Sequence, residues 1–314
     1  MEFEFIILFG LIALMRIIQT MSAKRVSDVV SGARFFRYGG YYNLLSALLS
    51  LIVLLCSEGK YFQSLETFLC SLAAAVFLGL ELFVYLKILK KTSLIVAQMF
   101  SVCSLCIPCL VGTIAFDEPM NLYSWLGIAL FILSLYFMIS NSEQKEKQGN
   151  KVKLSISTLI LLLVYCLCGG GIMIVQKIFA LKVEGGNVSE FSFLMFALNS
   201  LIFYVIYFSV KGLNKGQTER ITIENKTDSE LQLSKPLLIC GLFQAVAIFM
   251  INLSVTSLAK NLPSALLFSI SYAISIVTTM LVGAICCKEK ITTKNVVGII
   301  LAAVAIIVIN FLSA

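Results

Sequence analysis

The sequence contains no histidine, and only 13% of its 314 residues carry a charge. Without imidazole, the chain lacks the side chain that most often serves as a general base or a metal ligand near neutral pH. The low charge content excludes an ordinary soluble domain, in which about a quarter of the residues are charged. The chain also lacks a Walker-type phosphate-binding loop, so ATP hydrolysis is not expected of it.

Proline is also scarce, with four residues in the whole chain, as long helices require. Pro119, Pro236 and Pro263 fall near the ends of apolar runs, where a helix can begin or end. Pro108 falls inside such a run, where its missing backbone N–H predicts a kink.

Apolar residues, by contrast, make up 59% of the chain. A membrane-spanning helix needs about 20 mainly apolar residues. Runs of this length occur ten times, near residues 3–22, 38–57, 66–86, 92–115, 121–140, 155–180, 189–210, 236–258, 262–286 and 294–312. They do not alternate as the strands of a membrane barrel do. The first run lacks a basic start and is too long for a signal peptide. The sequence therefore predicts an all-α integral membrane protein with ten transmembrane helices in a lipid bilayer.

Lysine and arginine are distributed unequally between the two sides of this predicted bundle. Nineteen of the 24 fall in loops on the side opposite the N-terminus, and three fall in loops on the other side. Because positively charged loops remain in the cytoplasm, both termini are predicted to be non-cytoplasmic, in the plasma (inner) membrane. The net charge of +7 is then a signal of topology, and no nucleic-acid partner is indicated.

The two halves of the chain share short patterns, which indicates an internal repeat. A glutamate followed nine residues later by a glycine occurs at Glu118–Gly127 and again, 171 residues further on, at Glu289–Gly298. Within the predicted spans, Gln19 matches Gln176. Asn43 likewise matches Asn199.

The repeats divide the chain at a polar stretch. We predict a first five-helix repeat at residues 1–140, a polar linker at 141–153, and a second five-helix repeat at 154–314 with a polar loop at 211–235. Five is an odd number of spans, so the second repeat enters the membrane from the opposite face. Inverted repeats of this kind are typical of transporters that work by alternating access.

These features resemble the drug/metabolite transporter superfamily, in its EamA-like branch. The resemblance rests on the Glu–Gly pairs above and on Gly170–Lys177, and it extends over about residues 3–312. It implies two inverted five-helix repeats and the transport of metabolites. Studied members of the superfamily have cytosolic termini, whereas the charge distribution here predicts the reverse, and we follow the charge distribution.

Charged side chains inside spans are costly and indicate function by default. Arg16 and Glu81 lie at similar predicted depths, ~12 and ~9 Å from the same membrane face at helical rise. They either form a direct pair, or Arg16 extends to the headgroups while Glu81 faces water. Glu81 is the one carboxylate assigned to a span, which makes it the candidate for proton coupling. Lys177 is expected to extend to the headgroups.

Uncharged polar residues in the spans must face protein or water. Each of them can equally join two helices or contact a substrate, and Gln19 and Gln176 favour the substrate path because they match across the repeats. Tyr272 is a further path candidate, with packing as the alternative. Together with Arg16 and Glu81, the candidate path residues are Gln19, Asn43, Gln98, Gln176, Asn199, Gln244 and Tyr272. The glycines at 169–171 predict either a broken helix or close packing.

The ten cysteines indicate no metal site or cofactor. Cys103, Cys106 and Cys109 have a spacing seen around iron–sulfur clusters, but no fourth cysteine follows nearby. No disulfide pattern is recognisable.

The sequence therefore predicts a secondary transporter for a small polar metabolite, acting as an exporter or exchanger rather than as an enzyme. Its expected partners are the bilayer and a small-molecule substrate, and a homodimer is possible. Two alternatives remain. One is a membrane-embedded lipid-modifying enzyme, and the other is a lipid-flipping or partner subunit without a metabolite site of its own.

Overall fold

The computed structural model describes residues 2–30, 32–57, 64–91, 97, 101, 104, 106–115, 122–139, 156–218, 233–286 and 293–311. Within these residues the chain is helical and contains no strand. The helices are α1 (Glu2–Val29), α2 (Ala33–Cys56), α3 (Leu65–Lys91), α5 (Cys106–Ala115), α6 (Leu122–Ile139), α7 (Ile156–Lys182), α8 (Val188–Thr218), α10 (Lys235–Ala259), α11 (Ser264–Ile285) and α12 (Thr293–Phe311).

Seven of the described helices are long and apolar enough to cross a membrane, namely α1, α2, α3, α7, α8, α10 and α11. A shorter apolar stretch, Val296–Ala305, belongs to α12. These lengths indicate a multi-pass integral membrane protein, as the apolar runs predicted.

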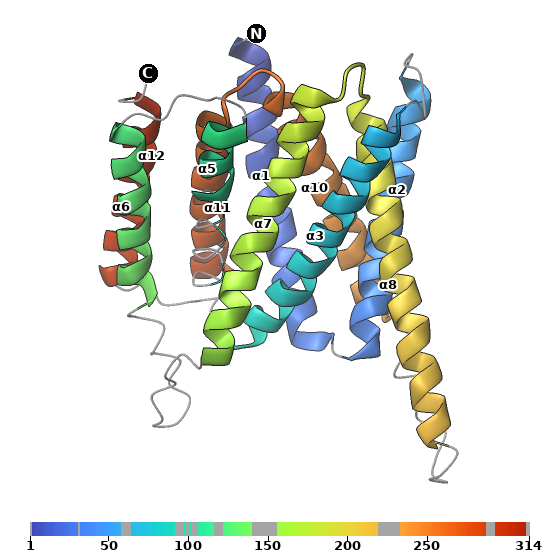
Figure 1. Cartoon of the computed structure of the whole chain (residues 1–314). Coiled ribbons are helices and arrows are strands. Elements are labelled where there is room, and N and C mark those ends of the chain that lie inside the picture. The colour runs from blue at the N-terminus through green and yellow to red at the C-terminus, as the bar shows by residue number, and fades with distance from the viewer. Residues whose placement is uncertain are drawn as a thin grey trace, which may run out of the picture.

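The helices stand side by side in one bundle (Figure 1). Within it, α2 packs along α8, α3 along α7, α1 along α10, and α6 along α12. The α6–α12 pair lies at one side of the bundle, and α1 begins on the same face at which α12 ends (Figure 1).

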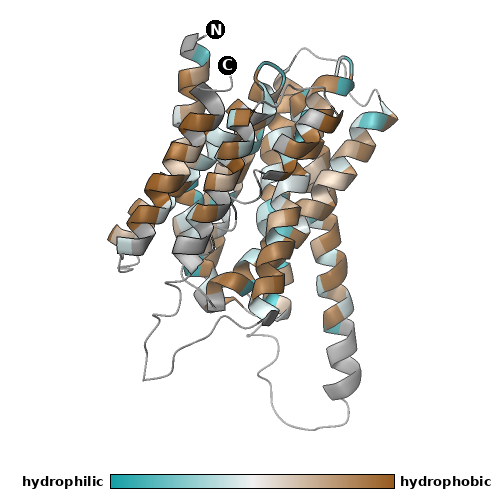
Figure 2. Cartoon of the chain, turned by 60° about the vertical axis from the view of Figure 1, so that its left-hand side comes forward, coloured by the Kyte–Doolittle hydropathy of each residue, from teal (hydrophilic) through white to brown (hydrophobic). Residues whose placement is uncertain are grey.

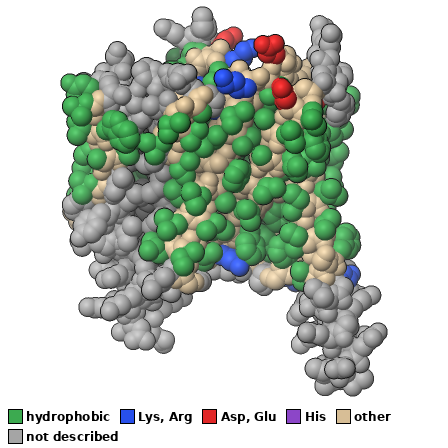
Figure 3. Space-filling model, viewed as in Figure 1, with side chains coloured by type: hydrophobic (Ala, Val, Ile, Leu, Met, Phe, Trp, Pro, Cys, Tyr) green, Lys and Arg blue, Asp and Glu red, His purple; other side chains and the backbone are tan. Residues whose placement is uncertain are grey.

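The surface of the bundle is apolar across its middle. Large apolar side chains are widely exposed there, among them Leu48 of α2 at 47% and Leu201 of α8 at 60%. Figure 2 shows hydrophobic residues along most of the helix lengths, with hydrophilic residues gathered at the upper loops. Figure 3 shows the hydrophobic belt from outside, with charged side chains at its upper and lower edges. Such a belt matches the hydrocarbon layer of a bilayer, where lipid solvates apolar side chains.

Glycines allow the helices to approach closely at several contacts. A β-carbon on Gly39 of α2 would lie 2.5 Å from the Phe203 ring of α8. In α7, a β-carbon on Gly170 would lie 2.7 Å from Ile107, and one on Gly171 would lie 2.9 Å from Phe77. Because α7 continues as one helix through this triplet, the prediction of close packing is confirmed and that of a broken helix is wrong.

Pro108 is not inside a long helix. It lies in the first turn of α5, which begins at Cys106, and Ser104 lies in a turn before it. The backbone N–H of Ile107 donates to the carbonyl of Ser104 at 3.3 Å. Proline is tolerated in a first turn because no intrahelical partner awaits its missing N–H. The prediction of a kink is therefore wrong, because Pro108 lies at the start of a helix.

Candidate functional site

A cavity lies at the centre of the bundle. It offers about 130 Å³ to the centres of water-sized molecules, whereas a single water needs roughly 10–15 Å³ on that measure. Residues of α1, α2, α3, α7, α8, α10 and α11 line it, together with Ser101. No described residue of α6 or α12 is among them. The cavity therefore has room for a small solute, and the α6–α12 pair stands apart from it.

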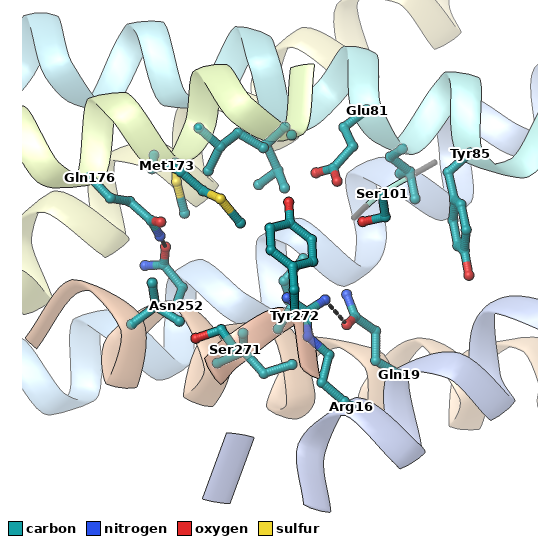
Figure 4. A pocket seen from close by; sticks show the side chains of 18 of the residues that line it. Arg16, Gln19, Glu81, Tyr85, Ser101, Met173, Gln176, Asn252, Ser271 and Tyr272 are labelled. Carbon is teal, nitrogen blue, oxygen red and sulfur yellow. Dashed lines mark hydrogen bonds between the residues drawn. The ribbon is translucent and has the colours of Figure 1, made fainter. Parts of the chain in front are cut away.

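The wall of the cavity is half polar, and Figure 4 shows part of it. Its polar side chains are Arg16, Gln19, Thr20, Tyr42, Glu81, Tyr85, Ser101, Tyr165, Gln176, Asn252, Ser271 and Tyr272. Its larger apolar side chains are Leu78, Leu82, Ile172, Met173, Met195, Phe196, Ile248, Ile251, Val255 and Phe268. Polar groups inside a membrane protein must face protein or water, so their convergence on one hollow makes it the candidate functional site.

Arg16 carries the positive charge of the cavity. Its Nη1 donates to Gln19 Oε1 at 2.9 Å, as residues three positions apart on one helix face can do. Its Nε is buried and has no hydrogen-bond partner in the described part of the chain. The guanidinium thus faces the cavity with unused donor capacity and does not extend to the headgroups.

Glu81 of α3 carries the negative charge. Its Oε1 lies 3.5 Å from the point where a β-carbon on Gly169 of α7 would be, so the carboxylate is in ordinary contact range of that helix. Among the described residues no ion pair joins Glu81 to Arg16, although the two charges interact electrostatically. Figure 4 shows Tyr272 between them, with its hydroxyl toward Glu81. The direct pair that equal depth predicted is therefore not formed.

Tyrosines form much of the remaining polar wall. Tyr85 of α3 and Tyr165 of α7 stack with ring centroids 5.4 Å apart. The hydroxyl of Tyr42 is buried and has no hydrogen-bond partner among the described residues. Tyrosine combines an apolar ring with a hydroxyl, so these side chains can contact both the apolar and the polar parts of a solute.

A chain of hydrogen bonds joins three helices along the cavity. Gln176 of α7 donates from Nε2 to Asn252 Oδ1 at 2.6 Å. Asn252 of α10 in turn donates from Nδ2 to Ser192 Oγ of α8 at 2.7 Å. Gln176 therefore both lines the cavity and joins α7 to α10.

Three predicted path residues lie away from the cavity. Asn199 Nδ2 donates to Asn43 Oδ1 at 3.1 Å between α8 and α2. The Tyr38 hydroxyl donates to Gln244 Oε1 at 2.7 Å between α2 and α10. These side chains join helices in a setting where lipid offers no partner. Gln98 lies outside the described residues.

With this geometry established, the chain can be compared with known proteins. Residues 156–311 match the EamA-like transporter family. The second half of the chain belongs to this family. Family members are transporters, so the central cavity lies in a protein that carries a transporter domain and several membrane-spanning helices.

A solved crystal structure shares the fold of the whole chain. It aligns with a TM-score of 0.64 over 98% of this chain and 96% of its own, at 10% sequence identity. At that identity the likeness concerns the fold alone. No curated protein matches the sequence.

Several features of the site are not evident from the sequence. Tyr42, Ser101, Tyr165 and Ser271 line the cavity, but tyrosines and serines are common in apolar helices and no spacing distinguishes these. Glu190 is a buried carboxylate in another spanning helix, only 3% exposed in the first turn of α8. A negative charge is favourable at that end of a helix.

The prediction for Lys177 is wrong. The side chain is 3% exposed, and its Nζ donates to the carbonyls of Ala259 at 3.2 Å and Leu262 at 2.7 Å. Ala259 ends α10, where the last carbonyls have no partner within the helix. A cation is favourable at this negative end of the helix dipole, so Lys177 caps α10 and does not extend to the headgroups.

We expect Lys177→Met to lower the stability of the transporter by about 2–3 kcal/mol, because hydrogen bonds from a charged donor are lost and buried carbonyls are left without a partner. The measurement is thermal unfolding of the purified protein in detergent. Lys182→Met, at the exposed end of the same helix, is the matched control and should leave the melting temperature unchanged. Equal melting temperatures for the two variants would contradict the capping role.

Proposed function

We propose that this protein is a secondary transporter that moves a small polar metabolite across the membrane, as an exporter or exchanger. One observation carries the proposal. A central cavity within an apolar helical bundle holds an arginine and a glutamate that are not paired with each other. Charges inside a membrane protein are costly and mark substrate or ion pathways.

The packing of the helices supports two inverted repeats. If α1, α2, α3, α5 and α6 correspond in order to α7, α8, α10, α11 and α12, the contact of α3 with α7 has its counterpart in that of α10 with α1. The contacts of α5 with α7 and of α11 with α1 correspond in the same way. The α2–α8 and α6–α12 contacts each join a helix to its own counterpart.

One hydrogen bond supports the same symmetry. Asn43 and Asn199, which match between the halves of the sequence, bond directly to each other. Equivalent residues meet where a two-fold axis passes between them. An axis near these asparagines, in the membrane plane, would relate the halves as alternating access requires.

The cavity favours a solute that carries both an anionic and a cationic group. A buried charge without a partner is costly, and a partner of opposite sign offsets that cost. A zwitterion can meet Arg16 with its anionic group and Glu81 with its cationic group, while its apolar part contacts Met173 or Phe268. Glu81 is also the carboxylate on the cavity wall that could carry a coupled proton when no solute is bound.

The lipid-modifying alternative receives no support from the cavity. Such an enzyme would need a cluster of carboxylates or histidines at a membrane face. Glu81 is the one carboxylate among the described residues that line the cavity.

The test is uptake by proteoliposomes that contain the purified protein. Labelled zwitterionic, cationic and anionic solutes of similar size are offered in parallel, with empty liposomes as the control. We expect uptake or counterflow of zwitterions above the other two classes. Preference for cations or anions would contradict the zwitterion, and uptake of none of them would contradict the transport function.

We also propose that both termini lie on the non-cytoplasmic side of the plasma membrane. The motive is the excess of lysine and arginine on the opposite side. A reporter fused after Ala314 should be active only outside the cytoplasm, and one inserted near Gly216 only inside it. The reverse pattern would contradict this orientation without affecting the fold.

A further inference from the structure

The two opposite charges of the cavity stand apart although they share one space. Both Arg16 and Glu81 line the cavity, and each acts electrostatically on the other. Attraction between opposite charges increases as the surroundings become less polar. Arginine also has a long flexible side chain, so some feature of the site must keep the guanidinium from the carboxylate.

Figure 4 shows Tyr272 in the line of view between Glu81 and Arg16. Its ring comes from α11 and is 3% exposed, and its hydroxyl points toward Glu81 (Figure 4). Tyr272 lies within electrostatic range of both Glu81 and Arg16. It also belongs to an apolar cluster with Val255, Phe268 and other buried residues. Close packing on this side restricts the ring, because well-packed interiors leave few alternative positions.

The hydrogen bond from Arg16 to Gln19 is the other restraint on the guanidinium. Gln19 is a neutral acceptor, and hydrogen bonds in which both groups are charged are stronger than those to a neutral group. The amide alone would therefore not hold Arg16 if the route to Glu81 were open.

We propose that Tyr272 is a positioning residue that keeps Arg16 and Glu81 from forming an ion pair, and so leaves both charges available to a bound solute. The availability of both charges to a solute rests on the proposed transport function, whereas the separation of Arg16 from Glu81 does not. Without the ring, the guanidinium moves onto the carboxylate and the cavity loses both of its charges to an internal pair.

The test is a double-mutant cycle of Arg16→Met and Glu81→Gln, read as melting temperatures of the purified protein in detergent. The cycle is measured with Tyr272 present, with Tyr272→Phe, which keeps the ring, and with Tyr272→Ala, which removes it. With Tyr272 or Tyr272→Phe, we expect the melting-temperature shifts of Arg16→Met and Glu81→Gln to add within about 2 °C in the double variant. In the Tyr272→Ala background they should fail to add by on the order of 5 °C, because the charges then interact directly. If Tyr272→Ala does not fold, Tyr272→Leu takes its place in the same cycle.

Two results would overturn the proposal. One is additivity in the ring-free background, which would mean that the charges stay apart without Tyr272. The other is strong coupling created by Gln19→Ala while Tyr272 is intact, which would make Gln19 the residue that separates them.

Solute binding separates this inference from the proposed function. Binding of a zwitterion should persist in Tyr272→Phe and fall at least about tenfold in Tyr272→Ala. Unchanged binding in Tyr272→Ala would contradict the idea that Tyr272 keeps the two charges available to a solute. If the cycle gives the expected coupling but the unmodified protein binds no zwitterion, the role of Tyr272 stands and the zwitterion proposal fails.

Discussion

Glu81→Gln is expected to weaken zwitterion binding by about 10–100-fold and to leave the fold intact. A hydrogen bond to a charged partner contributes about 1.5–3 kcal/mol, and each 1.4 kcal/mol is a factor of ten in affinity. Arg16→Met should have an effect of similar size, because it removes the partner for the anionic group. Binding is measured by titration calorimetry on the purified protein, and folding by its melting temperature.

Glu66→Gln is the matched control for this prediction. Glu66 lies in the first turn of the same helix but is exposed, so its replacement should not change affinity. Equal affinities for the Glu66→Gln and Glu81→Gln variants would show that Glu81 does not contact the solute. If Glu81 also carries the coupled proton, its glutamine variant at saturating solute retains exchange but no longer accumulates solute in response to a pH gradient.

Gly170→Leu should lower stability by about 3 kcal/mol or more. Even a β-carbon at this position would lie 2.7 Å from Ile107, and overpacking of a well-packed interior typically costs about 1–3 kcal/mol. Gly170→Ala is a milder case, in which a gain of up to about 1 kcal/mol in helix propensity partly offsets the clash. Melting temperatures measured in detergent report both changes.

Gly10→Leu provides the control for the glycine prediction. Gly10 is also helical, but no atom lies within 4 Å of the position of its β-carbon, and it is exposed on α1. A leucine there gains contact with lipid and should not destabilise the protein. If Gly10→Leu and Gly170→Leu destabilised the protein equally, packing between α7 and α5 would not explain the loss, because leucine is a better helix former than glycine.

Seven of the ten predicted apolar runs correspond to described helices long enough to cross a membrane, and the runs locate these helices better than they locate the helix ends. The run at 236–258 corresponds to α10 at Lys235–Ala259, within one residue at each end. The run at 3–22 stops well before the end of α1 at Val29. Lys24 and Arg25 end the apolar signal, but the helix continues because backbone hydrogen bonds do not depend on side-chain polarity. Length and hydropathy therefore locate the apolar helices, and helix ends need local information.

The candidate site was predictable only in part. Arg16, Gln19, Glu81, Gln176 and Tyr272 line the cavity, as a functional role for polar residues in spans requires. Three other polar residues find their hydrogen-bond partners on neighbouring helices instead, namely Asn43, Asn199 and Gln244. The sequence shows that each polar group needs a partner in the membrane. Whether that partner is a neighbouring helix or a solute depends on how the helices are rotated, which hydropathy does not determine.

The hydrogen bonds of two consecutive residues in α7 determine how that helix can move. Gln176 holds the middle of α10 through Asn252, and Lys177 holds its end through the carbonyl of Ala259. Sliding by one helical turn would displace α10 by about 5.4 Å, beyond the reach of either bond. Hydrogen bonds therefore join α7 to α10 at two separate points. Under the proposed rocking mechanism, we expect α7 and α10 to move together and the bending to occur at other helix contacts.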